Sequence, residues 1–249
     1  HEWSPDGQQF AYITRDNRVV KGLHILDLLT GTEKILKLPS YHNGFNNIFE
    51  WSPDSEYLAI QADFKDTVAP LIIVDRSLNN AARYFSNTKD IHTLLWSPDS
   101  KHLIIQQQSA QHNESDVLLD VESGKQQPMT QALDYFSAIT WLNDSEILYH
   151  TQSMKINLYN VKTQTTTLWI DGTIASDYLS MSPDMAWAIV EQNAGYTLYN
   201  LKKDNQPLFN LDPPFNGGLI EKDNTLRSFD YDNKIWYLYD LDTGEVITL

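Results

Sequence analysis

Short runs of apolar residues recur along the whole chain, and each run is bounded by turn-forming residues. Runs such as Leu58–Ile60, Leu71–Val74 and Leu103–Ile105 have the length of β-strands, and no stretch keeps the 3.6-residue apolar period of an amphipathic helix. Several runs are apolar at consecutive positions, which is typical of strands that are buried on both faces. The pattern therefore predicts an all-β chain that is nearly free of helix.

The sequence Trp-Ser-Pro-Asp occurs three times, beginning at Trp3, Trp51 and Trp96, and each copy stands a few residues ahead of an apolar run. Two independent anchors follow the repeat through the chain at spacings of 39 to 48 residues. The first is the turn aspartate, at Asp6, Asp54, Asp99, Asp144, Asp184 and Asp223. The second is the residue that closes the third strand, at Asp27, Asp75, Asp120, Asn160, Asn200 and Asp240. Both anchors indicate six units of four strands, and a repeat of this period is the signature of a repeat architecture.

Four-stranded sheets that are buried on both faces by neighbouring sheets are what a β-propeller provides. At 249 residues the chain is long enough for one domain or two. We predict a single domain over residues 1–249, a six-bladed β-propeller of four-stranded antiparallel blades. The approximate blade bounds are 1–38, 46–86, 91–129, 135–170, 174–210 and 216–249.

The Ser-Pro-Asp-Gly stretch has the residues of a type I turn with a following left-handed position. This geometry closes a hairpin. Ser55, Ser100, Ser145 and Met185 replace the glycine, so strain or another geometry is expected at those turns. Because the turn aspartates recur in every unit, we interpret them as structural. Unit one has only His1–Trp3 for its first strand, so that strand should be short, or residues ahead of it should complete it.

These residues resemble the TolB-like, or WD40-like, β-propeller repeat, and the resemblance covers the whole chain. The last unit, Ile235-Trp236-Tyr237-Leu238-Tyr239-Asp240-Leu241-Asp242-Thr243-Gly244-Glu245, is similar to the family pattern. The turn motif departs from it in units four and six. The family includes periplasmic TolB proteins, the non-catalytic propellers of prolyl-oligopeptidase-like enzymes, and extracytoplasmic domains of bacterial winged-helix regulators. The resemblance implies a domain that binds or filters peptides, proteins or small molecules, in a periplasmic or other extracytoplasmic location.

The net charge of −15 argues against a nucleic-acid-binding surface, which needs clustered Lys and Arg. There is no cysteine and no apolar run long enough to span a membrane, so we expect no membrane insertion by this domain. The chain opens almost inside a motif, which we interpret as a fragment of a larger protein.

No residue pattern for chemistry is present. The seven histidines show no metal-ligand spacing, and neither a Gly-x-Ser-x-Gly elbow nor a phosphate-binding glycine loop occurs. We therefore predict no catalytic residue, no metal site and no cofactor. The acidic stretch Asp230-Tyr231-Asp232-Asn233 has oxygen ligands suited to Ca²⁺, but turn chemistry is the default explanation.

The segments that lead into each first strand are unlike one another and combine aromatic side chains with Asp, His and Asn. In a propeller these segments meet at one mouth of the central channel. Rigid aromatic area with a few directional polar groups is typical of a binding surface. The alternative is that the aromatics fill the channel or hold neighbouring blades together. The candidate binding residues are Tyr41, His42, Asn43, Phe45, Asp90, His92, Asp134, Tyr135, Phe136, Asp177, Tyr178, Phe215 and Asn216.

Three hypotheses on function remain open. The first is a non-catalytic propeller that binds a peptide, protein or small ligand at the channel mouth. It would be the extracytoplasmic sensory domain of a larger bacterial protein, such as a membrane-bound winged-helix transcription regulator. The second is the substrate-gating propeller of a prolyl-oligopeptidase-like serine hydrolase whose catalytic domain lies outside the sequence. The third is a propeller enzyme such as a lyase or lactonase, which would need metal-binding carboxylates or histidines in the channel.

Overall fold

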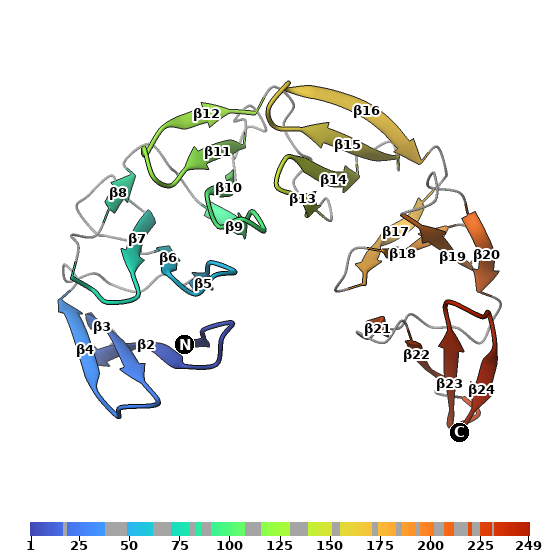
Figure 1. Cartoon of the computed structure of the whole chain (residues 1–249), viewed down its shortest axis with the longest axis horizontal. Helices are drawn as coiled ribbons and strands as arrows, with labels where there is room; N and C mark the ends of the chain where they lie inside the picture. Colours follow the sequence, from blue (N-terminus) through green and yellow to red (C-terminus); the bar gives the residue numbers. More distant parts are fainter. Residues whose placement is uncertain are drawn as a thin grey trace. The chain divides into compact units, whose positions relative to one another are not determined.

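The structure is a computed structural model, and every regular element among the residues that it describes is a β-strand. It describes residues 1–16, 19–37, 49–61, 71–79, 83–85, 91–107, 116–129, 139–150, 155–170, 174–182, 186–192, 195–201, 207–211, 219–220, 225–230 and 232–249. Within these ranges the strands form six four-stranded antiparallel sheets, and each sheet is built from four strands that are consecutive in the sequence (Figure 1).

The chain divides into two compact units, His1–Tyr135 and Phe136–Leu249, and each holds three sheets. Sheet 1 consists of β1 (Glu2–Trp3), β2 (Gln9–Asp16), β3 (Val19–Asp27) and β4 (Glu33–Lys37). Sheet 2 consists of β5 (Phe49–Trp51), β6 (Tyr57–Gln61), β7 (Leu71–Asp75) and β8 (Arg83–Phe85). Sheet 3 consists of β9 (Ile91–Trp96), β10 (His102–Gln107), β11 (Val117–Asp120) and β12 (Gln126–Pro128).

The second unit has the same organisation. Sheet 4 consists of β13 (Ile139–Asn143), β14 (Glu146–His150), β15 (Ile156–Asn160) and β16 (Thr165–Ile170). Sheet 5 consists of β17 (Ile174–Met181), β18 (Trp187–Gln192), β19 (Gly195–Asn200) and β20 (Pro207–Leu211). Sheet 6 consists of β21 (Leu219–Ile220), β22 (Thr225–Asp230), β23 (Ile235–Asp240) and β24 (Val246–Thr248).

The all-β, antiparallel prediction is confirmed, and each repeat forms four strands. The third strand of each repeat ends at the expected anchor residue. The residues that close the third strands, from Asp27 to Asp240, are the last residues of β3, β7, β11, β15, β19 and β23. The first strand of sheet 1 is two residues long, as expected. The single-domain assignment and the closed ring of six blades stay predictions.

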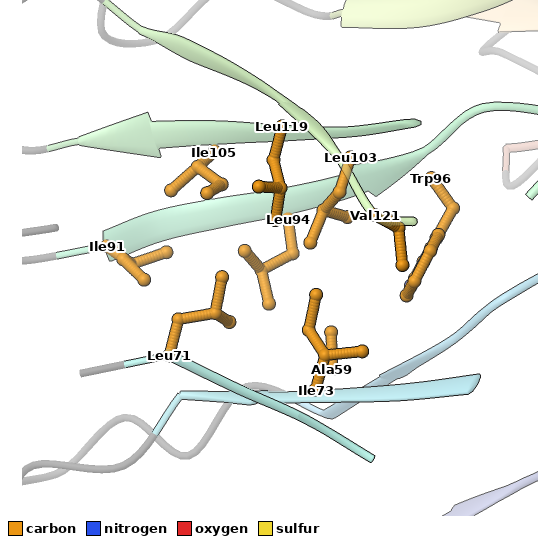
Figure 2. Close-up of a cluster of buried hydrophobic side chains, with 10 residues drawn as sticks. All are labelled: Ala59, Leu71, Ile73, Ile91, Leu94, Trp96, Leu103, Ile105, Leu119 and Val121. Atoms are coloured by element: carbon orange, nitrogen blue, oxygen red, sulfur yellow. The ribbon is translucent and has the colours of Figure 1, made fainter. Parts of the chain in front are cut away.

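Successive residues of the central strands point to opposite faces of a sheet, and in sheet 2 both sets are buried. Leu58, Ile60, Ile72 and Val74 pack against the Ala11, Leu23 and Ile25 side chains of sheet 1. The alternate residues Ala59, Leu71 and Ile73 pack against Leu103, Ile105 and Trp96 of sheet 3, as Figure 2 shows. Burial of each large aliphatic side chain contributes roughly 1.5–3 kcal/mol. The consecutive apolar residues of the sequence therefore serve two interfaces at once.

Sheet 5 has the same role in the second unit. Ala188 and Val190 of β18 pack with Leu148 and Ile156 of sheet 4. The intervening Ile189 packs with Leu226 and Tyr239 of sheet 6.

The Ser-Pro-Asp turns have the expected hairpin geometry. In the first, the Gly7 amide donates to the Ser4 carbonyl over 2.8 Å, and Gly7 is left-handed with φ of 68°. Ser55 and Ser100 keep this geometry in sheets 2 and 3, with φ of 64° and 60°. Of the two outcomes expected at the replaced glycines, Ser55 and Ser100 show a left-handed serine. Ser145 shows the other outcome, because its φ is not positive and Asn143 pairs directly with Glu146 in a tighter hairpin. Met185 lies outside the described residues.

The two left-handed serines join neighbouring sheets. The Asp6 amide of sheet 1 donates to the Ser55 hydroxyl of sheet 2 over 3.1 Å. In the same way the Asp54 amide of sheet 2 donates to the Ser100 hydroxyl of sheet 3 over 3.1 Å. A hydrogen bond of this kind contributes about 1 kcal/mol, which offsets the cost of a left-handed residue that is not glycine.

The motif tryptophans fill the joints between sheets. Trp96 is buried, and its indole nitrogen donates to the Glu50 carbonyl of sheet 2 over 3.0 Å. Trp51 is equally buried against sheet 1, but its indole nitrogen has no hydrogen-bond partner among the described residues. The two equivalent joints therefore differ by one hydrogen bond.

We expect Ser100→Ala to lower the free energy of unfolding by about 1–2 kcal/mol, because it removes the bond to Asp54 and keeps the left-handed backbone. Ser100→Gly should cost less, since glycine relieves the backbone strain. Urea unfolding measures both. Gly7→Ala is the matched control for the backbone term alone, because nothing lies within 4 Å of an added Cβ there. Equal losses for the Ala and Gly variants of Ser100 would contradict this assignment.

We expect Trp96→Phe to cost about 1 kcal/mol more than Trp51→Phe, because only Trp96 loses a hydrogen bond and leaves a carbonyl without its partner. Both variants remove similar apolar area, so the comparison isolates the polar term. The free energy of unfolding of the two variants, measured side by side, is the test. Equal costs would mean that the Trp51 indole is paired in solution.

Candidate functional site

The recurring turn aspartates are held by their own hairpins. Asp6 accepts a hydrogen bond from the Ser4 hydroxyl over 2.6 Å and from the Gln8 amide over 2.9 Å. Asp54 and Asp99 accept from Ser52 and Ser97 at the same distance. Although partial burial acts to raise it, these bonds and the Arg76 charge hold the pKa of Asp6 below its usual range. The structural interpretation of these aspartates is confirmed for the three turns.

The acidic stretch at residues 230–233 also uses its carboxylate to form a turn. The buried Asp230 accepts hydrogen bonds from the Asp232 and Asn233 amides and from the Asn233 side chain over 2.7–3.1 Å. The Asn233 side-chain bond comes first among the causes that hold the pKa of Asp230 below its usual range. These contacts are those of an Asx turn, as the default explanation expected. No group of three or more His, Cys, Asp or Glu side chains is placed for a metal ion in the described parts of the chain.

Most of the predicted channel-mouth residues lie outside the described residues. They are Tyr41, His42, Asn43, Phe45, Asp90, Asp134, Tyr135, Phe136, Phe215 and Asn216. For three others, His92, Asp177 and Tyr178, the structure describes the backbone. The grouping of all thirteen residues at one mouth stays a prediction.

His92 lies at an irregularity in the first strand of sheet 3. Thr93 pairs with Gln106 and Ile91 pairs with Gln107, so His92 is an extra residue between two consecutive pairs. This is a β-bulge, which locally bends a strand and changes the direction of a side chain.

Asp177 and Tyr178 lie inside β17, and the prediction that they form a link ahead of the strand is wrong. Ile174 pairs with Gln192, and the next pair is Leu179 with Val190. Between these two pairs β17 has four residues, whereas its partner strand β18 has one. The strand extends further than its apolar pattern indicates because an irregular register accommodates these polar residues. Sheet 5 thus resembles sheet 3 in having a register shift near the start of its first strand.

A second candidate, which the sequence analysis missed, is a pair of carboxylates between sheets 1 and 2. Glu2 and Glu50 each stand directly before the motif tryptophan, on strands β1 and β5, which contact each other. Burial and the charge of Glu50 raise the pKa of Glu2 from 4.5 to about 7, and burial raises the pKa of Glu50. One Glu2 oxygen is buried without a hydrogen-bond partner among the described residues. The repeated Glu-Trp order was the sequence signal for this pair.

Such a pair can hold one proton near neutral pH, because two adjacent ionised carboxylates repel each other. The protonated form of Glu2 can donate a hydrogen bond, and the ionised form can accept a cationic group. The pair lies at a sheet joint, so its protonation also affects stability.

No protein-family model matches the chain. A segment of 58 residues, 23% of the chain, is 40% identical to the Tol-Pal system protein TolB of Alcanivorax borkumensis (strain ATCC 700651 / DSM 11573 / NCIMB 13689 / SK2). The match spans 13% of that protein's length.

Solved structures resemble the fold over nearly the whole chain. The C-terminal WD40 domain of Sif2 has a TM-score of 0.59 at 17% identity, with 98% of this chain and 69% of that chain covered. Dipeptidyl peptidase 4 of Porphyromonas gingivalis has a TM-score of 0.70 at 12% identity, with 99% of this chain and 45% of that chain covered. At these identities the likeness concerns the fold, which is propeller-like, and it includes both an enzyme and a WD40 domain. Among the described residues there is no helix of the length and apolarity needed to cross a bilayer.

We expect the free energy of unfolding to fall as the pH rises from about 4.5 to about 7, and to fall less in Glu2→Gln. In this window the unfolded chain has lost the Glu2 proton while the folded chain still holds it, so folding becomes less favourable as pH rises. Urea unfolding across pH 4–8 measures the difference between the two proteins. A Glu2→Gln profile that is parallel to the unsubstituted one would show that Glu2 has an ordinary pKa.

Proposed function

We propose that the chain is a non-catalytic β-propeller domain that binds a peptide, a protein or a small ligand. In this proposal the six four-stranded sheets are blades of one propeller, and the segments that lead into their first strands form the binding surface. The observation that carries the proposal is the propeller-like fold, in which sheets 2 and 5 are buried on both faces by their neighbours.

Two local features support a binding surface at the starts of the first strands. Bulges often lie beside functional sites, where they set the direction of a side chain. The extra residue His92 in β9 and the irregular segment with Asp177 and Tyr178 in β17 are features of this kind. The turns at the other ends of β5 and β9 use their polar groups internally, so they offer fewer groups to a ligand.

For the wider protein, we propose the extracytoplasmic sensory or interaction domain of a larger bacterial protein, such as a membrane-bound transcription regulator. The repeat pattern and the TolB segment support this context. The net charge of −15 supports partners other than nucleic acid. We expect the gene to encode a winged helix and one membrane-spanning segment upstream of residue 1. Sequencing that part of the gene is the test.

The alternative is the substrate-gating propeller of a prolyl-oligopeptidase-like serine hydrolase. The TM-score of 0.70 to a dipeptidyl peptidase favours it. A gene that encodes a nucleophile elbow downstream of residue 249 would replace the first proposal with this one.

We expect Tyr178→Ala, alone and combined with Tyr41→Ala and Tyr135→Ala, to weaken ligand binding at least tenfold, which is about 1.4 kcal/mol, while the melting temperature stays unchanged. The probe is a peptide selected on the unsubstituted chain from a phage-displayed library of random peptides. Isothermal calorimetry measures its affinity for each variant.

Leu29→Ala is the control, because it removes an exposed apolar side chain in the turn after β3, away from the proposed surface. If the tyrosine variants instead lose their folding transition, these side chains fill the channel and the binding proposal fails. If the selected peptide binds all variants equally, the surface lies elsewhere.

A further inference from the structure

Sheet 1 carries an aromatic cluster on the face that points away from sheet 2. Trp3 and Phe10 lie with ring centroids 4.8 Å apart, Phe10 and Tyr12 are 5.9 Å apart, and Tyr12 stacks on His24 at 4.8 Å. Together with Leu26 these side chains form what we call the aromatic face. Ala11, Leu23 and Ile25, at alternate positions on the same strands, point the other way into the joint with sheet 2.

The aromatic face occupies the positions that are buried in the next two sheets. The strand registers align Trp3, Phe10 and Tyr12 with Trp51, Leu58 and Ile60 of sheet 2. In sheet 2 these three side chains are buried against sheet 1. The motif tryptophan is 5% exposed in sheet 2 and 7% exposed in sheet 3, but 57% exposed in sheet 1. A large apolar side chain that is buried in the equivalent joints and exposed here indicates a surface that a partner covers.

A polar rim holds the aromatic face in place. The Tyr12 hydroxyl donates to a Glu33 oxygen, and the same oxygen lies 3.3 Å from the His24 Nδ1 atom. The Thr14 hydroxyl lies 3.0 Å from His24 Nε2. Side chains that are fixed before binding lose little conformational entropy when a partner covers them.

We propose that the aromatic face is the docking surface for a further four-stranded sheet of the same repeat, contributed by polypeptide outside residues 1–249. The established joints define what that sheet presents. At the joint between sheets 2 and 3, Ala59, Leu71 and Ile73 cover the face that contains Trp96. The partner sheet therefore presents a small residue at the centre of its face and branched aliphatic residues around it.

One observation favours a sheet from outside the sequence. The residue aligned with Ala11 and Ala59 is Arg227 in sheet 6, an exposed charged side chain at the central position of the covering face. The inference goes beyond the proposed function, and it would give the propeller at least one blade more than six.

Residue 7 supplies an independent test. At the two joints of the first unit, the hydroxyl of the serine after the turn aspartate accepts a hydrogen bond from the turn amide of the preceding sheet. Sheet 1 has Gly7 at that position, with φ of 68° and nothing within 4 Å of an added Cβ. A sheet docked on the aromatic face would bring its turn amide to residue 7. Gly7→Ser should therefore stabilise the docked form and slightly destabilise the free one.

The experiment compares the 249-residue chain with a chain that carries a second copy of residues 46–93 directly ahead of His1. This addition places a copy of sheet 2 one repeat before sheet 1. Hydroxyl-radical oxidation followed by peptide mass spectrometry measures the accessibility of each tryptophan. We expect Trp3 to be oxidised at least tenfold faster than Trp51 in the 249-residue chain, and at the rate of Trp51 in the extended chain.

Two variants control the result. Ala59→Glu in the added copy places a charge at the centre of the covering face, and should expose Trp3 again while Trp51 stays protected. Gly7→Ser should raise the melting temperature of the extended chain and lower that of the 249-residue chain. These measurements separate docking from misfolding of the addition, because Trp96 reports on the folded state throughout.

Three outcomes would overturn the proposal. Protection of Trp3 in the monomeric 249-residue chain would show that the chain covers this face itself. Protection that grows with protein concentration, together with a dimer in size-exclusion chromatography, would make a second copy the partner. Rapid oxidation of Trp3 in a folded extended chain would mean that the face does not accept a sheet of this repeat.

Discussion

Apolar burial on both faces of a four-stranded sheet is the constraint on which the rest of the structure depends. A strand that is buried on one face alternates apolar and polar residues, but β6, β7 and β10 each have apolar side chains at three or more consecutive positions. A sheet with such strands, as in sheets 2 and 3, therefore needs two neighbours. A sheet joint in turn fixes the depth of the motif tryptophan and brings one hairpin turn against the next, where the Asp6–Ser55 and Asp54–Ser100 hydrogen bonds form. Polar and apolar contacts therefore specify the same packing, and that agreement favours a single arrangement.

The strand order and the ends of the third strands could be predicted from the sequence because a local rule repeats. Each repeat carries its own turn residues and its own closing Asp or Asn, so the third strands, such as β7, β11, β15 and β23, end at the predicted residues. The prediction of strand limits failed where pairing between strands, and not the local pattern of apolar residues, decides how far a strand extends. Asp177 and Tyr178 look like a link because they are polar or isolated from an apolar run, yet an irregular register keeps them in β17. Pairing with β18 decides this, and a neighbouring strand is not visible in a local pattern.

The candidate site was harder to predict for a similar reason. The carboxylate pair becomes significant only when β1 lies beside β5, since the raised pKa of Glu2 comes from burial and from a residue 48 positions away. The hydrogen bonds of Ser55 and Ser100 were likewise absent from the sequence interpretation. In the sequence, a serine in place of the turn glycine indicates only the strain of a left-handed backbone. Its role as a hydrogen-bond acceptor depends on the turn of the preceding sheet. Sequence periodicity locates strands, while the chemistry depends on which strands become neighbours.

The joint between turns also bears on how such a chain can change in length. The donor amide belongs to the aspartate of the motif and the acceptor hydroxyl belongs to the residue that follows it, so one repeat carries both halves of the joint. A duplicated repeat would bring a donor for the repeat after it and an acceptor for the repeat before it, with no co-adapted substitution elsewhere. Gene duplication can therefore lengthen this array one repeat at a time, and a glycine such as Gly7 lacks the acceptor hydroxyl for that connection.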